Sequence, residues 1–447
     1  MSVIFWYRKD LRVGDHPALR MAIDSGSEVF AVVTADQLGT PFASLSEARR
    51  LSLISSWRNL NADLEEKLLV LESPKDLIEY ANRVSAKKVF ASRVYDTNGM
   101  AELTAIGADL KSSGIELVLG PGNYAIAPGT VKKSDGTSYR VYTPFFNEWV
   151  KLNPGMPFES PDLSTLQNHL SSAPAMDIDL EVSSGTPAGE NFALVTLRRF
   201  VDHRVKDYAD NRNRADLGGT SHLSHALSHG EIHPRTILAL LPNGAGGDVF
   251  LKEIAWREFY ADILYQRPET LSEYLNPAFA GMRYNEPGTD FAAWKNGQTG
   301  YPMVDAGMRQ LATTGWMHNR VRMIVASFLI KDLHIEWQHG ASWFEQNLTD
   351  FDPASNSHGW QWTAGCGTDA SPYYRIFNPT GQGLKFDPNG DYVRNYVPEL
   401  RHLSGAEVHE PWNHTHGYSM GYPKRIVDHA TERLESLERL EEIRKKS

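Results

Sequence analysis

The sequence predicts two unlike regions: an N-terminal α/β domain built on a doubly wound parallel sheet, and a larger all-α domain after it. Over about residues 1–125, short apolar runs alternate with longer stretches of helical periodicity, which is typical of parallel strands joined by crossover helices. After about residue 190 the strand signals stop, and helical patterns separated by Gly and Pro continue to the end. We therefore expect domains at 1–125 and 191–447, joined by a connector at 126–190 rich in Gly, Pro, Ser and Asp.

Five short apolar runs are the expected strands of the sheet. No GxGxxG motif follows the first run, which continues instead into RKDLRVGDHPAL. The usual dinucleotide fingerprint is therefore missing, and any ligand of this domain must bind in another way. The runs are 3–7 (VIFWY), 29–34 (VFAVVT), 67–71 (KLLVL), 88–91 (KVFA) and 115–119 (IELVL).

Length and composition limit the class of protein. A chain of 447 residues exceeds what one hydrophobic core supports. Because Cys366 is the only cysteine and the N-terminus lacks a signal-peptide pattern, we expect a cytoplasmic protein without disulfides or a cysteine-rich metal site. No apolar run approaches the roughly 20 residues needed to cross a bilayer. The net charge of −10 disfavours a nucleic-acid partner unless basic residues gather locally.

The stretch 300–378 carries the densest set of unusual residues. A long helix is expected after Gly315, and on it Trp316, Asn319 and Met323 recur at spacings of three and four, so they share one face. A face that mixes an aromatic ring, an amide and a thioether indicates a ligand. An ordinary amphipathic helix is the alternative.

A second stretch, 218–234, is rich in Ser and His. Thr220 and Ser221 lie where a helix is expected to begin, so their hydroxyls and free backbone N–H groups could hold a phosphate, although capping alone is the simpler interpretation. His222, His225 and His229 fall on one face of that helix, which permits a metal site. Without an acidic or cysteine ligand close by, we favour histidines near a pyrophosphate or in a polar interface.

Two further segments present carboxylates beside aromatic residues. In 252–268, Glu253, Trp256 and Tyr260 line one helical face, which suits a flat guest such as a nucleobase, while an ordinary helix with an ion pair is the alternative. Near residue 350, two aspartates could indicate acid–base chemistry or a divalent metal. Pairing with an arginine of the preceding helix, Arg320 or Arg322, is simpler. Redox-active tryptophans without a metal site favour an organic redox cofactor, and Trp337 and Trp360 are the candidates for an electron relay. The candidate residues of this segment are Asp350, Asp352, Asn356, Trp360 and Trp362.

Taken together, these motifs resemble the DNA photolyase and cryptochrome family, most closely the class I-like enzymes that repair cyclobutane pyrimidine dimers. The resemblance covers nearly the whole chain, and the motifs occur in the family's order and at similar spacing. They are FWYRKDLRVGDHPAL, TSHLS, WREFY, GYPMVDAGMRQL, TGWMHNRVRM and GWQW.

The resemblance implies a folded FAD whose adenine and isoalloxazine approach each other. Arg322 and Asp350 would form a salt bridge against the flavin ring, and Asn356 matches the position that faces flavin N5. Photolyases typically have Asn there, plant cryptochromes Asp and animal ones Cys, so this residue favours repair. The implied cofactor residues are Tyr208, Thr220, Ser221, His222, Leu223, Ser224, Asn319, Arg322, Asp350, Asp352 and Asn356.

The resemblance also implies a lesion pocket and a light-driven reaction. A damaged dinucleotide is flipped out, photoexcited reduced FAD donates an electron, the cyclobutane ring opens and the electron returns. Glu253 would hydrogen-bond the dimer radical anion in its protonated form, and the histidine pair of (6-4) photolyases is absent. The implied lesion and DNA residues are Glu253, Trp256, Arg257, Asn319, Arg320, Met323 and Trp362.

Two auxiliary features are implied less directly. The family's electron relay matches Trp360 and Trp337, but its outer position aligns with Tyr284, so we expect slower or pH-dependent photoreduction. Relatives often hold a folate or deazaflavin antenna in the sheet domain, and SRVYDTNGMAEL occupies one of the expected places without matching either type.

Alternatives to repair come from other classes of protein. The first is a cryptochrome-type blue-light photoreceptor, which Asn356, the lesion pocket and the lack of an extended C-terminal tail disfavour. The second is a flavoprotein that binds nucleic acid without repair. We expect a monomer that contacts UV-damaged DNA of the nucleoid through a local basic patch, drawn from Arg257, Arg320, Arg375, Lys385 and Arg394.

Overall fold

The computed structural model describes residues 1–36, 40–176, 187–368 and 374–445, which fall into two compact units. These units are defined by contacts, so the domain boundaries predicted near residues 125 and 190 stay a prediction. The first unit, here the sheet unit, comprises Met1–Tyr139, Thr143–Lys206 and Ser221–Pro268. The second, the helical unit, comprises Arg140–Tyr142, Asp207–Thr220 and Glu269–Ser447.

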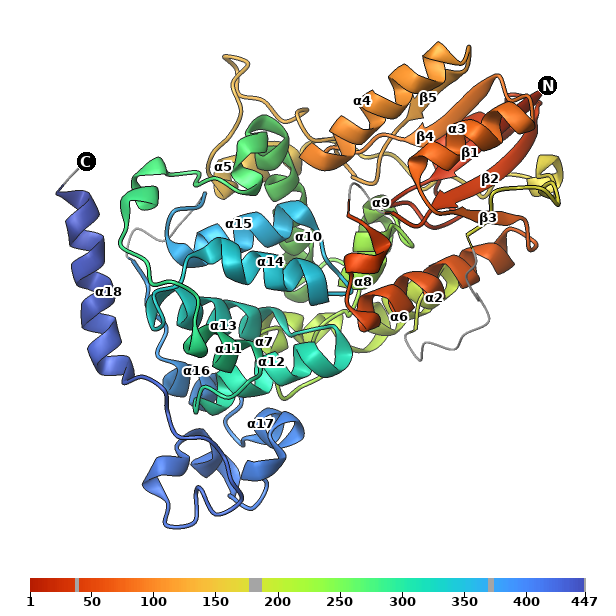
Figure 1. Ribbon diagram of the computed structural model, residues 1–447. Coiled ribbons are helices and arrows are strands. Elements are labelled where there is room, and N and C mark those ends of the chain that lie inside the picture. Colours follow the sequence, from red (N-terminus) through yellow and green to blue (C-terminus); the bar gives the residue numbers. More distant parts are fainter. Residues whose placement is uncertain (37–39, 177–186, 369–373, 446–447) are drawn as a thin grey trace. The chain divides into compact units, whose positions relative to one another are not determined.

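Five parallel strands form the sheet, in the order β3-β2-β1-β4-β5 (Figure 1). The order reverses at β1, which pairs with β2 on one side and β4 on the other, as in a doubly wound sheet. All five predicted strands are confirmed, with ends shifted by at most one residue. They are β1 Ser2–Tyr7, β2 Glu28–Thr34, β3 Leu68–Leu71, β4 Lys88–Ser92 and β5 Glu116–Gly120.

Helices cover both faces of the sheet because alternate side chains of each strand point to opposite sides. Phe5 of β1 lies in one buried cluster with α1 and α2, whereas its neighbours Ile4 and Trp6 lie in another with α3 and α4. The first cluster also holds Trp57 of α2. The bounds are α1 Pro17–Ile23, α2 Glu47–Asp63, α3 Pro74–Arg83 and α4 Thr97–Ser112.

The segment after β1 is held by buried ionic contacts. Asp15 is 5% exposed and accepts hydrogen bonds from Nε of Arg235 at 3.0 Å and from Oγ1 of Thr236 at 2.8 Å. The backbone N–H groups of Val13 and Gly14 donate to the Glu190 carboxylate. These partners belong to α6 Glu190–His203 and α9 Pro234–Leu240. The other helices here are α5 Tyr142–Trp149, α8 Ser224–His229 and α10 Ala245–Gln266.

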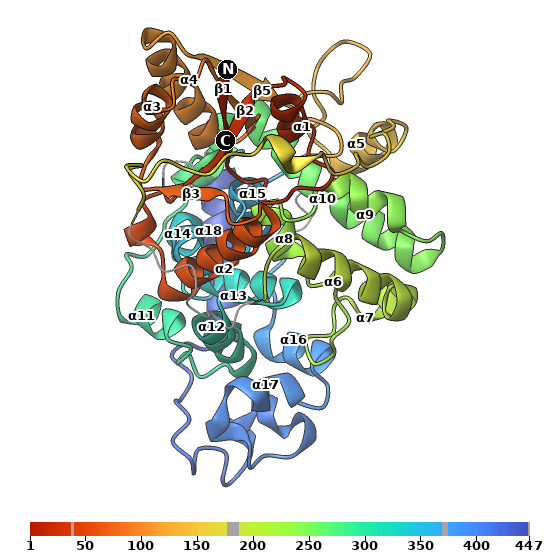
Figure 2. The ribbon, with the colours of Figure 1, turned by 90° about the vertical axis from the view of Figure 1, so that its right-hand side faces the viewer.

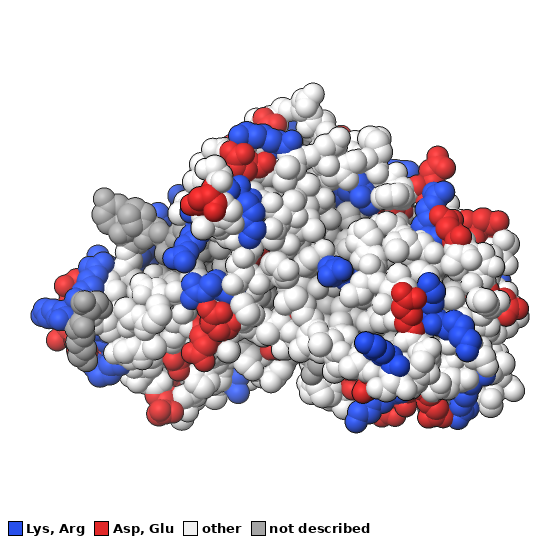
Figure 3. All heavy atoms as spheres, turned by 90° about the horizontal axis from the view of Figure 1, so that it is seen from above, with Lys and Arg blue, Asp and Glu red and all other residues white. Residues whose placement is uncertain are grey.

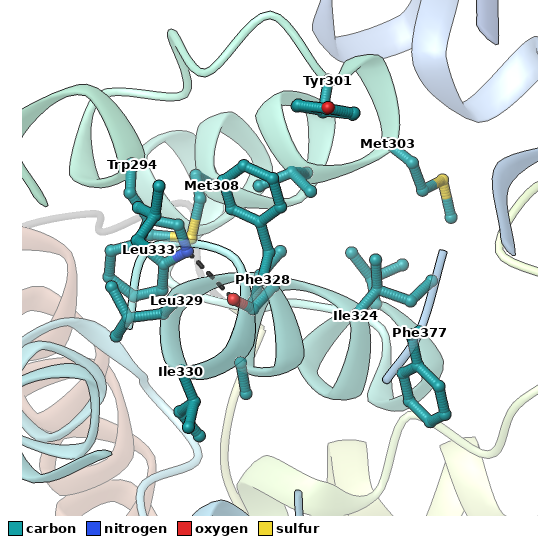
Figure 4. Close-up of a cluster of buried hydrophobic side chains, with 14 of the residues drawn as sticks. Trp294, Tyr301, Met303, Met308, Ile324, Phe328, Leu329, Ile330, Leu333 and Phe377 are labelled. Atoms are coloured by element: carbon teal, nitrogen blue, oxygen red, sulfur yellow. Dashed lines mark hydrogen bonds between the residues drawn. The ribbon is translucent and has the colours of Figure 1, made fainter. Parts of the chain in front are cut away.

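The helical unit is built around α13, whose Val321, Val325 and Leu329 are fully buried. Figure 4 shows this core, in which the indole Nε1 of Trp294 donates to the Val325 carbonyl at 3.0 Å. Helices α12 and α13 lie side by side in both ribbon views (Figures 1 and 2). The helices are α7 Tyr208–Asn211, α11 Thr289–Lys295, α12 Pro302–Thr314, α13 Asn319–Lys331, α14 Trp337–Asn347, α15 Pro353–Ala364, α16 Pro379–Phe386, α17 Asp391–Tyr396 and α18 His429–Arg444.

The long helix expected after Gly315 begins later than predicted. Gly315 ends α12 in the left-handed conformation, with φ of 65°, and α13 begins only at Asn319. The cause is His318, whose ring nitrogen accepts from the backbone N–H of Arg320 at 3.1 Å and so caps the new helix. Trp316 therefore lies in the turn between the helices, and the prediction that it shares a helical face with Asn319 and Met323 is wrong.

The fold class is otherwise as predicted. Within the described ranges, the strands of the sheet all precede residue 121, and helices make up the regular structure of the helical unit. No helix of those ranges is both long and apolar enough to cross a membrane.

Candidate functional site

The predicted salt bridge between Arg322 and Asp350 is present in the helical unit. The guanidinium Nη2 lies 2.7 Å from the Asp350 carboxylate, while Nε donates to the Met317 carbonyl at 2.8 Å. The aspartate side chain is 1% exposed and the arginine side chain 24% exposed. A buried carboxylate needs a charged partner, so this contact confirms that one aspartate pairs with the preceding helix.

Helix α15 carries four of the predicted residues in order. Asp352 caps it by accepting from the Ser355 N–H at 2.7 Å. Nδ2 of Asn356 donates to the Ala341 carbonyl at 3.0 Å, which leaves its side-chain oxygen to accept another hydrogen bond. Trp360, one turn later, is buried, and Trp362 is half-buried. The amide and the two indoles therefore follow one another along a single helix.

Helices α14 and α15 approach closely because Gly340 leaves room for Trp360. A Cβ atom built on Gly340 would collide with the six-membered ring of that indole. Gly340 lies one turn after Trp337, which is 1% exposed. The two predicted inner relay residues thus come from neighbouring helices, and the indole N–H groups of both are buried without a hydrogen-bond partner among the described residues.

Trp337 contacts a tyrosine that sequence reasoning missed. Tyr274 lies edge-on to its ring, with the ring centroids 6.1 Å apart, and is stacked on Tyr284 at 6.4 Å. No sequence signal marks Tyr274, because it lies in an irregular segment after the turn Pro268–Leu271. The predicted outer residue Tyr284 is therefore joined to Trp337 through a third ring.

The expected phosphate loop has a different local structure from the predicted one. Helix α8 begins at Ser224, three residues beyond Ser221, whose Oγ accepts from the Leu223 N–H at 3.3 Å. His222 precedes the helix with a positive φ of 55°, so its placement on one helical face with His225 and His229 is wrong. In the other unit, the predicted cofactor residue Tyr208 is buried and Thr220 is half-buried.

The remaining histidines of that stretch form a polar cluster. The rings of His225 and His229 lie 4.3 Å apart, and Nε2 of His225 lies 3.6 Å from the Glu231 carboxylate. An acidic group is thus close by, contrary to expectation. Among the residues that the structure describes, no group of three or more His, Cys, Asp or Glu side chains could hold a metal ion.

Helix α10 places the predicted lesion residues on one side. Trp256 and Tyr260 lie with ring centroids 5.4 Å apart, and Glu253 is half-buried one turn earlier. On the buried side, Glu258 accepts hydrogen bonds from Nε1 of Trp149 and from the N–H of Ile126. Burial raises the pKa of Glu258 to about 7. Glu258 therefore fixes α10 to its neighbours, whereas Glu253 lies on the partly exposed side of the helix.

Two arginines of the predicted basic patch already have partners within their own units. Arg257 donates to the carbonyls of Asn123 and Leu227, and Arg320 donates to Oδ1 of Asn213 at 2.7 Å. By contrast, Lys385 and Arg375 are exposed. On the face seen in Figure 3, acidic and basic side chains are interspersed. Their roles at DNA stay predictions.

Comparisons with known proteins extend over nearly the whole chain. A family model described as DNA photolyase matches residues 3–162, and one described as the FAD binding domain of DNA photolyase matches residues 250–442. The deoxyribodipyrimidine photo-lyase of Agrobacterium fabrum is 39% identical, covering 97% of this chain and 96% of the relative.

Two solved structures share the fold. A bacterial class III photolyase from Agrobacterium tumefaciens superposes with a TM-score of 0.90 at 36% identity, covering 99% of this chain and 98% of that one. A Synechocystis cryptochrome superposes with a TM-score of 0.87 at 28% identity, covering 98% of each chain. This fold and these matches define a two-domain flavoprotein. The chain belongs to the DNA photolyase and cryptochrome family.

The residues present fit FAD. Asn356 offers an amide oxygen to a ring nitrogen, and the oriented Arg322 guanidinium can donate to a ring carbonyl or phosphate. These donors of the helical unit are mostly neutral, and the buried carboxylate of Asp350 is paired to Arg322. In the sheet unit, taken by itself, the hydroxyls of Ser221 and Ser224 are of the kind that hold a pyrophosphate, and Thr220 of the helical unit offers another such hydroxyl.

Proposed function

We propose that this protein repairs cyclobutane pyrimidine dimers in DNA by a light-dependent reaction that uses bound, reduced FAD. The observation that carries the proposal is Asn356, on the same helix as Trp360 and with an amide oxygen still able to accept a hydrogen bond. An amide can accept from or donate to flavin N5 without imposing a charge. Full-length similarity to proteins named deoxyribodipyrimidine photo-lyase supports it.

The side chains divide the work of binding between cofactor and substrate. The flavin, when bound, reduced and excited, supplies the electron that opens the cyclobutane ring. Arg322, fixed by Asp350, orients the ring system, and Asn356 holds its central nitrogen. Trp256 offers its ring to the flipped-out pyrimidines. The stacking excludes water from one side of the lesion.

Glu253 holds a proton at the lesion. Its carboxyl, in the protonated form, donates a hydrogen bond to a pyrimidine carbonyl and stabilises the negative charge that develops there. The glutamate is half-buried at its place on α10, so it remains accessible to a substrate. Glu258, five residues on, accepts hydrogen bonds from Ala125 and Ile126, which precede α5, and from Trp149, which ends it.

A light-versus-dark repair assay tests the proposal. The reduced, FAD-loaded protein is given an oligonucleotide with one thymine cyclobutane dimer, and recovery of thymine absorbance is followed. We expect recovery in light only, and a repair rate at least roughly tenfold lower in Glu253→Gln, since one donor to developing charge is lost. The matched control, Asp248→Asn, changes an exposed carboxylate of the same helix and should repair as the wild type.

Failure of repair would support the second candidate, a blue-light photoreceptor, for which similarity to the Synechocystis cryptochrome is the favouring observation. That result requires bound FAD that is photoreducible but no recovery of thymine at any light dose. The protein would then signal through a conformational change instead of repairing DNA.

The partners follow from the reaction. We propose that a monomer in the cytoplasm binds UV-damaged DNA through local basic side chains on an acidic protein. Lys385 and Arg375 are exposed and available for phosphate contacts. Affinity for the damaged oligonucleotide should therefore fall as salt concentration rises.

A further inference from the structure

Tyr274 joins the predicted outer residues of the electron relay. It is 6% exposed, and its ring lies at 86° to that of Trp337 with centroids 6.1 Å apart. On its other side it stacks on Tyr284, at an interplanar angle of 17° and a centroid distance of 6.4 Å. All three rings belong to the helical unit. Tyr274 is therefore the intermediate ring for an electron that moves between Tyr284 and Trp337.

The hydroxyl of Tyr274 has an unusual partner for a buried tyrosine. It donates to Oε1 of Glu336 at 2.7 Å. Glu336 precedes Trp337 directly and is the N-terminal capping residue of α14. Its side chain is half-buried, so the carboxylate has a route to solvent. The ring of Tyr274 thus contacts Trp337, and its hydroxyl is hydrogen-bonded to the carboxylate of the preceding residue, Glu336.

Among the residues that the structure describes, Tyr284 has no hydrogen bond to a carboxylate. Its hydroxyl donates to the backbone carbonyl of Phe279 at 3.4 Å, a longer contact to a group that does not take up a proton. The proton of Tyr274 is directed at a carboxylate instead. Of the two tyrosines, Tyr274 is the one placed to lose an electron and a proton together.

Oxidation of a tyrosine requires that proton loss. The phenol is a poor donor while it keeps its proton, because the radical cation that would form is strongly acidic. Burial raises the pKa of Tyr274 well above its usual value, and the nearby Tyr284 and Glu336 raise it further, so the proton stays on until the electron leaves. A positioned carboxylate then serves as the general base.

We propose that Tyr274 is the proton-coupled electron donor to oxidised Trp337 and that Glu336 is its proton acceptor. The inference rests on the proposed function, since Trp337 becomes oxidised only by losing an electron through Trp360 toward the light-excited oxidised flavin. One electron passes from Tyr274 to Trp337, and one proton passes from its hydroxyl to Glu336. The products are neutral Trp337, a neutral tyrosyl radical and a neutral carboxylic acid.

The charge balance explains what the step contributes. Before it, a cation on the buried Trp337 lies beside the Glu336 carboxylate; after it, both residues are neutral. Charge recombination then requires the proton to return together with the electron. The charge-separated state should therefore live longer, which gives an external reductant time to reduce the tyrosyl radical.

The structure also offers a competing electron donor to oxidised Trp360. The ring of Trp294 lies edge-on to Trp360 at 6.2 Å, and its Nε1 donates to a backbone carbonyl. Trp294 is fully buried in the core shown in Figure 4. Its indole N–H donates to the Val325 carbonyl, a peptide group that does not take up a proton from a tryptophan cation.

Time-resolved electron paramagnetic resonance on the FAD-loaded protein tests the inference. Ring-deuterated tyrosine identifies a tyrosyl radical by its changed hyperfine pattern. We expect this radical after a flash in the wild type, its loss in Tyr274→Phe, and formation slowed by roughly 100-fold in Glu336→Gln, the effect of removing a positioned base. Trp294→Phe should leave radical yield and rate unchanged. Circular dichroism and FAD content establish that each variant is folded and loaded.

Several outcomes would overturn the inference. A tyrosyl radical of full yield in Tyr274→Phe that disappears in Tyr284→Phe assigns the step to Tyr284. An unchanged rate in Glu336→Gln, or the same rate in H₂O and D₂O, removes the proton acceptor. A wild type whose bound flavin is not photoreduced removes the relay altogether. If the radical behaves as expected while dimers are not repaired, only the proposed repair function fails.

Discussion

The sheet unit fixes the segments that follow β1 and β5 with buried charges, whereas the helical unit fills the space between α13, α14 and α15 with aromatic rings. In the first, Asp15 is bound by Arg235, and Glu258 by three N–H donors. In the second, Trp360 lies among Trp294, Phe344 and Gly340.

The difference shows which contacts are framework and which can conduct. A buried ion pair holds backbone segments in one geometry but offers no path for an electron. Adjacent aromatic rings provide such a path and pack at interior density as well. Each kind of contact therefore fails differently when it is perturbed.

Breaking a buried charge pair should have the largest effect on stability. Asp15→Asn leaves the Arg235 guanidinium uncompensated in a site where its side chain is 10% exposed, and we expect unfolding free energy to fall by about 3–5 kcal/mol. Denaturant titration measures it. The control is Asp24→Asn, which breaks the exposed pair with Arg20 and should change stability by less than about 1 kcal/mol. Equal effects would show that the buried pair has no special role.

Crowding the aromatic region should cost less. Gly340→Ala places a methyl group against the Trp360 ring, and overpacking of this kind destabilises by about 1–3 kcal/mol. Alanine otherwise stabilises a helix relative to glycine by about 0.5–1 kcal/mol. Gly359→Ala in α15 is the matched control, because its Cβ meets no atom within 4 Å, and it should raise the melting temperature. A stabilised Gly340→Ala variant would contradict the close helix contact.

Glu258 should give a modest dependence of stability on pH. Burial raises its pKa to about 7 from 4.5, although Trp149 and two backbone N–H groups oppose the shift. The folded state then keeps a proton that the unfolded chain has lost. This group therefore stabilises the fold below about pH 4.5, and its contribution is lost as pH rises to about 7. Urea titrations from pH 4.5 to 8 should show a shallower fall in Glu258→Gln; identical pH profiles would exclude the mechanism.

The sequence predicted what depends on local pattern. The five strands follow from apolar runs, since burial on both faces of a parallel sheet leaves a continuous apolar signal. That an aspartate near residue 350 pairs with an arginine of the preceding helix followed from opposite charges on neighbouring segments, and the family resemblance implied the particular pair, Arg322 with Asp350. By contrast, the late start of α13 was missed because the spacing of Trp316, Asn319 and Met323 fits a helix, although His318 just before Asn319 is a possible cap.

Contacts between distant residues could not be predicted from spacing. Tyr274 and Glu336 are separated by 62 positions, and nothing in the composition around Tyr274 marks it. Arg257 was counted in the predicted basic patch, and its guanidinium donates to the carbonyl groups of Asn123 and Leu227, contacts that spacing does not reveal. In both cases the fold brings together groups whose pairing depends on tertiary geometry alone.

If the buried aromatics of the helical unit are a redox path, Trp360→Phe should block it. The FAD-loaded variant is illuminated with an external reductant, and the loss of oxidised-flavin absorbance is followed beside the wild type at equal FAD content. We expect photoreduction to be abolished while FAD binding and the melting transition persist. Photoreduction at the wild-type rate would contradict it, and would leave Trp360 and its neighbours as ordinary core.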